Sequence, residues 1–176
     1  MSERGHGREV RGSMVILGID PGNVRAGYGV IKREGGVFTH LGSGLLRVGR
    51  EKNAGAQLVA LEKDLRRIIQ KYHPGAAGLE KLFASNNMKT VMGVAEARGI
   101  IHKVIFENNL RLVELAPQTV KLSVTGSGRA DKKGVAKMVH LILNMTIDDL
   151  LDDTTDALAI AIAAAGELPP DIAKRG

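Results

Sequence analysis

The sequence contains no cysteine among its 176 residues. Disulfides, thiolate metal sites and cysteine nucleophiles are therefore excluded, and we expect the protein to reside in a reducing cytoplasm. No apolar run approaches the roughly 18 residues that a membrane span needs, so we expect no membrane segment. The first ten residues lack an apolar core, and we expect no signal peptide there.

What remains is typical of one globular domain. Apolar residues make up 44% of the chain, which is long enough to bury a hydrophobic core. We expect residues 1–13 to be a disordered lead, residues 14–166 to form a single domain, and residues 167–176 to be a flexible tail.

The net charge of +6 points to a polyanionic partner such as a nucleic acid, because lysine and arginine neutralise phosphates. Ordinary solubility charge is the alternative. Several acids discussed below end segments that we expect to be buried. Removing these acids from the surface leaves it more basic still, which favours the nucleic-acid interpretation.

The order of the elements predicts an α/β fold. Strands at 14–20, 27–32 and 37–47 form an antiparallel meander, with a hairpin turn at Glu34-Gly-Gly36. No helix follows the first strand, which excludes a Rossmann start. Further periodicity predicts strands at 76–80 and 110–116 and helices at 54–72, 86–107, 117–124, 131–143 and 156–165. We expect a mixed sheet with helices on both faces.

Two of these strands end in a carboxylate. Asp20 ends the first strand and Glu80 ends the strand at 76–80. A partly buried carboxylate costs free energy unless it is paired or binds a metal. We expect the two strands to be neighbours, and a divalent cation would relieve the repulsion between the two acids. The alternatives are turn chemistry for Asp20 and an exposed strand end for Glu80.

A second pair of acids opens the last helix. Asp153 and Asp156 are three residues apart, a spacing that places them on one helix face. The helix that follows contains almost only Ala, Leu and Ile, so we expect it to be buried against the sheet with its first acids near the sheet edge. The alternative is capping, with Asp153 as N-cap and Asp156 as part of a variant capping box.

Four such acids predict a metal site. Oxygen-only ligands favour Mg²⁺ or Mn²⁺ over zinc. On a basic protein the natural reaction is phosphodiester hydrolysis, in which two metal ions clamp the attacking and leaving oxygens.

An ordered set of motifs lies between about residues 14 and 165. It comprises Gly18-Ile-Asp20-Pro-Gly, Gly27-Tyr-Gly-Val, Glu80 with Phe83 and Asn87, Ala97-Arg-Gly99, and Asp153-Thr-Thr-Asp156-Ala-Leu-Ala-Ile-Ala. This set closely resembles the RuvC family of bacterial Holliday-junction resolvases. The resemblance implies a ribonuclease H-like fold with a five-stranded sheet. It also implies a homodimer that nicks two strands of like polarity at a four-way DNA junction in recombination and repair. An association with a branch-migration helicase complex is implied in the same way.

The resemblance also assigns residues. The family's catalytic, metal-binding acids match Asp20, Glu80, Asp153 and Asp156, with two ions per site. Its basic residues near the site match Lys121 and Lys132, and its loop aromatic matches Phe83, which we expect to stack on junction bases. The alternatives are a solvated helix face for the two lysines and a core anchor under the loop for Phe83. Asn87 and Arg129 complete the expected DNA contacts; for the loop around Arg129 the alternative is a plain linker.

The chain departs from the family pattern at three positions, where it has Lys81, Ala84 and Asp153. Many relatives have a second bulky residue at position 84 and Gln or Arg at position 81, and some have His at position 153. These departures affect stacking and metal preference rather than the type of reaction. A preference for Mn²⁺ over Mg²⁺ is consistent with them.

Three other functions are consistent with parts of the sequence. A different ribonuclease H-like nuclease would share the acids but act on another substrate. A non-catalytic junction-binding module would need the basic surface but not the acids. Actin-like ATPases and sugar kinases share the opening strand, acid and glycine turn, but they need two such domains and a longer chain.

Overall fold

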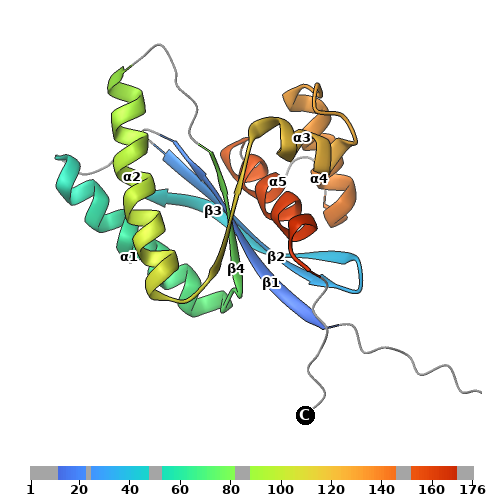
Figure 1. The fold of residues 1–176 in the computed structure, drawn as a ribbon, viewed down its shortest axis with the longest axis horizontal. Coiled ribbons are helices and arrows are strands. Elements are labelled where there is room, and N and C mark those ends of the chain that lie inside the picture. Colours follow the sequence, from blue (N-terminus) through green and yellow to red (C-terminus); the bar gives the residue numbers. More distant parts are fainter. Residues whose placement is uncertain (1–11, 23–24, 48–52, 82–87, 146–151, 170–176) are drawn as a thin grey trace, which may run out of the picture.

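The structure is a computed structural model that describes residues 12–22, 25–47, 53–81, 88–145 and 152–169 (Figure 1). A five-stranded sheet has the order β3-β2-β1-β4-β5. The strands are β1 (Ser13–Pro21), β2 (Arg25–Glu34), β3 (Val37–Arg47), β4 (Ala76–Glu80) and β5 (Arg111–Leu115). Strands β1 to β3 form the predicted antiparallel meander, whereas β4 pairs in parallel with β1 and β5 in parallel with β4. The predicted mixed sheet is confirmed.

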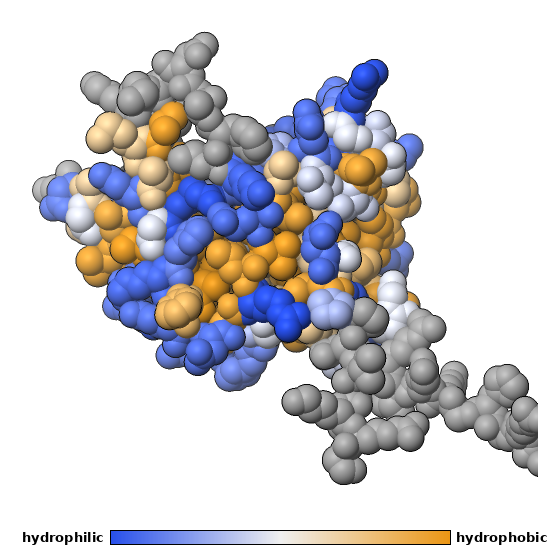
Figure 2. Space-filling view, in the orientation of Figure 1, coloured by the Kyte–Doolittle hydropathy of each residue, from blue (hydrophilic) through white to orange (hydrophobic). Residues whose placement is uncertain are grey.

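Helices cover both faces of this sheet, as predicted (Figure 1). One layer contains α1 (Ala54–Tyr72) and α2 (Met88–Glu107), and the other contains α3 (Pro117–Thr125), α4 (Lys132–Leu143) and α5 (Asp152–Glu167). Figure 2 shows apolar side chains between the two layers, with hydrophilic side chains flanking them. None of the helices within the described residues is both long and apolar enough to span a membrane.

Large aliphatic side chains fill the space between the sheet and the α1–α2 layer. Leu61 and Leu65 of α1 are fully buried, as their helical spacing predicts, and they pack with Leu17, Ile19 and Ile101. Helix α1 begins after Asn53, whose side chain accepts a hydrogen bond of 2.8 Å from the Ala56 amide. This cap satisfies one of the unpaired amides at the helix start.

The opposite face is packed by small residues. Gly18 of β1 and Gly78 of β4 lie directly against α5, whose inner face contains Ala157, Ala161 and Ala164. A Cβ atom at Gly18 would lie 2.0 Å from the Ala157 carbonyl oxygen. Glycine is therefore required at this position for α5 to approach the sheet.

Helix α5 differs from the prediction at its start. It begins at Asp152 rather than at Asp156, so Asp153 lies within its first turn. Asp153 therefore lies inside the helix rather than at its N-cap position. Acids and threonines have modest helix propensity and resemble a loop in sequence. Here Thr154 and Thr155 are buried, and tertiary packing together with the favourable placement of acids near a helix N-terminus outweighs that propensity.

The other end of α5 is held by an arginine from β2. The Arg33 guanidinium donates hydrogen bonds to the Ala165 carbonyl, to the Leu168 carbonyl at 3.1 Å and to the Pro169 carbonyl at 2.7 Å. A cation at a helix C-terminus satisfies carbonyls that have no partner within the helix and complements the helix dipole. The position of α5 along the sheet is thus held at its C-terminus as well as by the glycine contacts.

Candidate active site

Strand register brings the first two acids together. In the parallel β1–β4 pair, Gly18 lies opposite Gly78 and Ile19 opposite Leu79, so Asp20 and Glu80 occupy the next position on adjacent strands. Because side chains alternate along a strand, these acids share the face of Gly18 and Gly78, which is the α5 face. The expected pairing of these two strands is confirmed.

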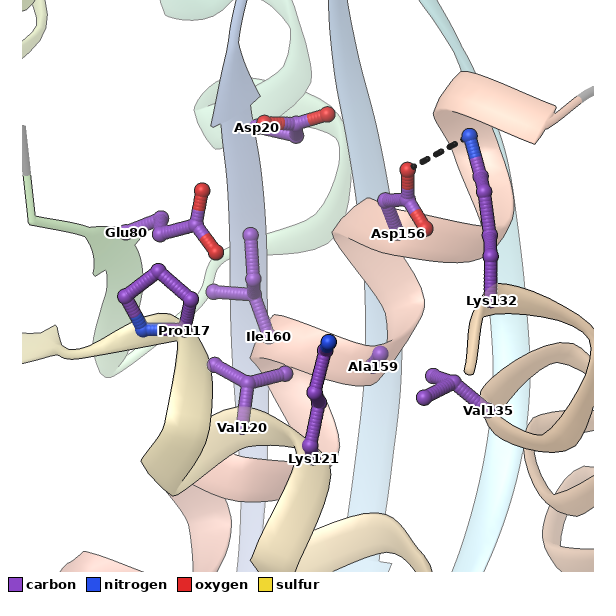
Figure 3. A pocket seen from close by; sticks show the side chains of 10 residues that line it. All are labelled: Asp20, Glu80, Pro117, Val120, Lys121, Lys132, Val135, Asp156, Ala159 and Ile160. Atoms are coloured by element: carbon purple, nitrogen blue, oxygen red, sulfur yellow. Dashed lines mark ion pairs between the residues drawn. The ribbon is translucent and has the colours of Figure 1, made fainter. Parts of the chain in front are cut away.

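Helix α5 brings a third acid to the same place. Asp20, Glu80 and Asp156 all line one cavity of about 310 Å³ (Figure 3). In Figure 3 their carboxylates lie around the same opening, each from a different element. The floor and sides of the cavity are formed by Pro117, Val120, Val135, Ala159 and Ile160. A negatively charged rim thus lies above an apolar floor.

Two lysines reach this cavity from the helices beside α5. Lys132, at the start of α4, places its Nζ 3.2 Å from Oδ2 of Asp156. Lys121 of α3 also lines the cavity (Figure 3). The site therefore combines acids with cations, which is the combination that binding of a phosphodiester and a metal requires.

The surroundings of the Glu80 carboxyl disfavour its charged form. Burial raises the pKa of its carboxyl, and the negative charge of Asp156 raises that pKa further, while Arg98 and Lys121 oppose the shift. A divalent cation would reverse this balance, because it favours the charged carboxylates. Carboxylate oxygens are the donor type that Mg²⁺ and Mn²⁺ prefer.

The metal site is not complete within the described residues. No three histidine or acidic side chains in that part of the chain are arranged to hold one ion. The side chain of Asp153 lies outside the described set, although its backbone belongs to α5. Asp20, Glu80 and Asp156 therefore supply the described part of the predicted carboxylate cluster.

The predicted DNA contacts are only partly described. Phe83 and Asn87 lie outside the described residues. Arg129 is exposed in the α3–α4 loop, where its amide donates a hydrogen bond of 3.3 Å to Ser127 Oγ. Lys121, Arg129 and Lys132 all belong to the α3–α4 segment, which lies on the same side of the sheet as the cavity.

Arg98 lies near the site, although the sequence predicted no role for it beyond its place in the motif Ala97-Arg-Gly99. Arg98 of α2 donates a hydrogen bond to the main-chain carbonyl of Glu80 and pairs with Glu114 of β5. A signal was present, because Arg98 directly follows Ala97, which is fully buried in the apolar stripe of α2. A charged residue beside such a stripe needs a partner.

The sheet order and the acids at the adjacent ends of β1 and β4 define a protein with a ribonuclease H-like fold. The family described as "Crossover junction endodeoxyribonuclease RuvC" matches residues 16–164. The chain therefore belongs to the RuvC family.

Relatives and a solved structure agree with this assignment. A RuvC protein of Brachyspira hyodysenteriae is 40% identical over 152 residues, which cover 86% of this chain and 94% of the relative. A RuvC protein of Pseudothermotoga lettingae is 38% identical over 148 residues, which cover 84% and 91%. The structure titled "T. thermophilus RuvC in complex with Holliday junction substrate" has a TM-score of 0.81 at 27% identity, covering 86% of this chain and 93% of that one.

Proposed function

We propose that this chain resolves four-way DNA junctions by symmetric, metal-dependent phosphodiester hydrolysis on two strands of like polarity, in recombination and repair. Its family consists of crossover junction endodeoxyribonucleases, and the similar Thermus structure is titled as a complex with a Holliday junction. The observation that carries the proposal is the cavity where Asp20, Glu80 and Asp156 meet Lys121 and Lys132.

The acids have the role of metal ligands in this proposal. Asp20, Glu80 and Asp156, together with Asp153 from the first turn of α5, would hold two Mg²⁺ or Mn²⁺ ions. Bound ions of this kind activate water and stabilise the leaving oxyanion. The protein's own contribution is to hold the four carboxylates on rigid elements, with β1 and β4 fixed by the sheet and α5 fixed by its contacts with glycine.

The basic residues have the role of phosphate contacts. Lys121 and Lys132 lie beside the carboxylates, where they can bind the scissile phosphate and the charge that develops on it. Arg129 extends the basic surface along the loop between α3 and α4, where it would contact the DNA backbone. Phe83 and Asn87 remain predicted DNA contacts, with Phe83 stacking on unpaired bases at the junction centre.

Symmetric cleavage is best explained by a two-fold homodimer, because a dimer presents two sites to a two-fold junction. Helix α2 offers a face for it. The side chains of Met92 and Phe106 are 59% and 85% exposed, and Ala95 and Gly99 lie exposed between them. Exposed apolar and small residues along one helix are typical of a helix–helix interface. A branch-migration helicase as partner, and a location in the bacterial cytoplasm, stay predictions.

The variant Asp20→Asn tests the proposal. We expect it to bind a four-way junction as wild type does, because the basic surface is unchanged. Nicking with Mg²⁺ or Mn²⁺ should fall at least about a hundred-fold, as when a group that stabilises the transition state is removed. Binding is measured by gel shift in EDTA and nicking on a labelled junction under single turnover.

Two results would contradict the proposal. Unimpaired nicking by Asp20→Asn would exclude the carboxylate site. A wild-type protein that cuts linear duplex as readily as junctions would favour a ribonuclease H-like nuclease acting on another substrate.

A further inference from the structure

Arg98 joins three elements behind the candidate active site. One nitrogen of its guanidinium donates a hydrogen bond to the main-chain carbonyl of Glu80, at the end of β4. Another pairs with the Glu114 carboxylate on β5. Its side chain is only 11% exposed, so this cation is held between α2 and the sheet rather than in solvent. Such a buried charge needs both of its partners.

The contact comes from the side of the sheet opposite to the cavity. Side chains alternate along β4, so Gly78 and Glu80 face α5, whereas Leu79 packs in the α1–α2 core. Arg98 belongs to α2 and does not line the cavity. Arg98 therefore binds the main-chain carbonyl of Glu80 from one face of the sheet, while the Glu80 carboxylate points to the other face.

Glu80 needs such support because of its position. It is the last residue of β4, and it faces the like charge of Asp156 in a partly buried site. Repulsion between the two carboxylates tends to displace the strand end. The ladder to β5 holds that end on one edge, where Leu115 lies opposite Glu80 and accepts a hydrogen bond of 2.8 Å from the Lys81 amide. Arg98 adds a second anchor that also carries a positive charge.

We propose that Arg98 is a positioning residue that holds the Glu80 carboxylate in place for metal binding, an inference that rests on the proposed function. The planar guanidinium is suited to this role, because it donates to two acceptors in a fixed geometry. Lysine at this position would keep the charge but lose the paired geometry. Groups that orient a metal ligand typically change metal affinity or activity about 10–100-fold when they are replaced.

The chain supplies a matched control in Arg66. This arginine also forms two ion pairs, with Glu62 at 2.8 Å and with Glu107, and it also joins a helix pair, α1 and α2. Its partners Glu62 and Glu107 both belong to helices, and Arg66 does not line the cavity. A general loss of helix packing should therefore affect Arg66→Lys and Arg98→Lys alike, whereas a positioning effect should appear in Arg98→Lys alone.

The experiment compares Arg98→Lys, Arg66→Lys and Glu80→Gln with wild type. Mn²⁺ affinity is measured by calorimetry without DNA, nicking under single turnover, junction affinity in EDTA, and folding by thermal melting. For Arg98→Lys we expect Mn²⁺ affinity and nicking each to fall about 10–100-fold, with junction affinity unchanged. Arg66→Lys should match wild type in all but its melting temperature.

Three outcomes would overturn the inference. Wild-type Mn²⁺ affinity and nicking in Arg98→Lys would show that Arg98 does not position the site. Equal losses in Arg98→Lys and Arg66→Lys would show a role in fold stability only. Nicking by Glu80→Gln would remove the proposed function itself, whereas an inactive Glu80→Gln beside an unaffected Arg98→Lys would overturn the inference alone.

If Arg98→Lys does not fold, the variant Glu114→Gln tests the inference instead. Glu114→Gln keeps an acceptor for Arg98 but removes the charge that holds it. We expect a loss of Mn²⁺ affinity in the same direction, smaller than for Arg98→Lys. Unchanged affinity in a folded Glu114→Gln protein would then overturn the inference.

Discussion

The two faces of the sheet are packed by different means. Long aliphatic side chains such as Leu61, Leu65 and Ile101 separate the sheet from α1 and α2, whereas glycines in β1 and β4 bring the sheet into near contact with the backbone of α5. Side chains can repack when a neighbour changes, but backbone atoms yield little. The packing of β1 and β4 against α5 therefore leaves little room for a larger side chain, which suits a site whose ligands come from three separate elements.

The carboxylates of the two layers also differ. Between α1 and α2, Glu62 and Glu107 alternate with Arg66 and Lys103, and hydrogen bonds from these cations lower the pKa of both carboxyls. In the cavity, burial and Asp156 raise the pKa of Glu80. The pairing of Glu62 and Glu107 with Arg66 and Lys103 contributes to stability, whereas the burial of the Glu80 charge opposes it. The difference indicates that Glu80 is placed for a ligand rather than for the fold.

Among tests of the packing difference between the two faces, Gly18→Ala is expected to have the largest effect on stability. The added Cβ would lie 2.0 Å from the Ala157 carbonyl oxygen and 2.6 Å from the Ala161 amide nitrogen, so α5 would have to move. We expect a loss of about 3 kcal/mol or more in the free energy of unfolding, at the upper end of overpacking effects. Chemical denaturation followed by circular dichroism measures it.

Two other glycines provide controls for this prediction. Gly78→Ala meets Ala164 Cβ at 2.7 Å and should cost less, because this closest approach is longer than the 2.0 Å at Gly18. Gly166→Ala, also in α5, meets nothing within 4 Å and should be neutral or stabilising. Equal stability of all three variants would show that the close packing of α5 is unimportant.

A smaller effect is expected from the metal itself. An ion that binds only the folded chain stabilises it by about 2.7 kcal/mol at a concentration of 100 times its Kd. We therefore expect added Mn²⁺ to raise the Tm of wild type and to have little effect on Asp20→Asn. An equal rise in the Tm of Asp20→Asn would show that the stabilising ion binds outside the cavity.

The smallest effect is expected in the pH dependence of stability in metal-free buffer. Because the pKa of Glu80 is raised above its ordinary value of 4.5 in the folded chain, its destabilising effect is complete above the raised pKa and disappears below about pH 4.5. Glu80→Gln should thus melt at a higher temperature than wild type at pH 7. The difference should shrink as the pH falls.

Glu62→Gln should behave in the opposite way. The pKa of Glu62 is lowered, so its contribution to stability is present above pH 4.5 and is lost as the pH falls through the lowered pKa. This variant should melt below wild type at pH 7 and approach it in acid. If the Tm of each variant differed from that of wild type by the same amount at every pH, Glu62 and Glu80 would not differ in their contribution to stability.

Most of the fold could be predicted from periodicity and turn residues. Alternation, the glycine turn at Glu34-Gly-Gly36 and the spacing of Leu61 and Leu65 are local patterns, and they placed the strands and α1 closely. The start of α5 could not be predicted in this way. Asp153, Thr154 and Thr155 have the composition of a loop, and only burial of the threonines shows why they are helical.

The sequence by itself determined which chemistry is available: carboxylates at the ends of buried segments, a basic surface, and no thiol. The order of the elements also predicted that β1 and β4 are neighbours. Only the tertiary structure decided the register of these strands, which places Asp20 beside Glu80, and the helix contacts, through which α5 brings Asp156 to the same cavity and α2 brings Arg98 to the main chain of Glu80. These contacts join residues that are far apart in the chain, and local patterns do not specify the register or the helix face at which distant residues meet.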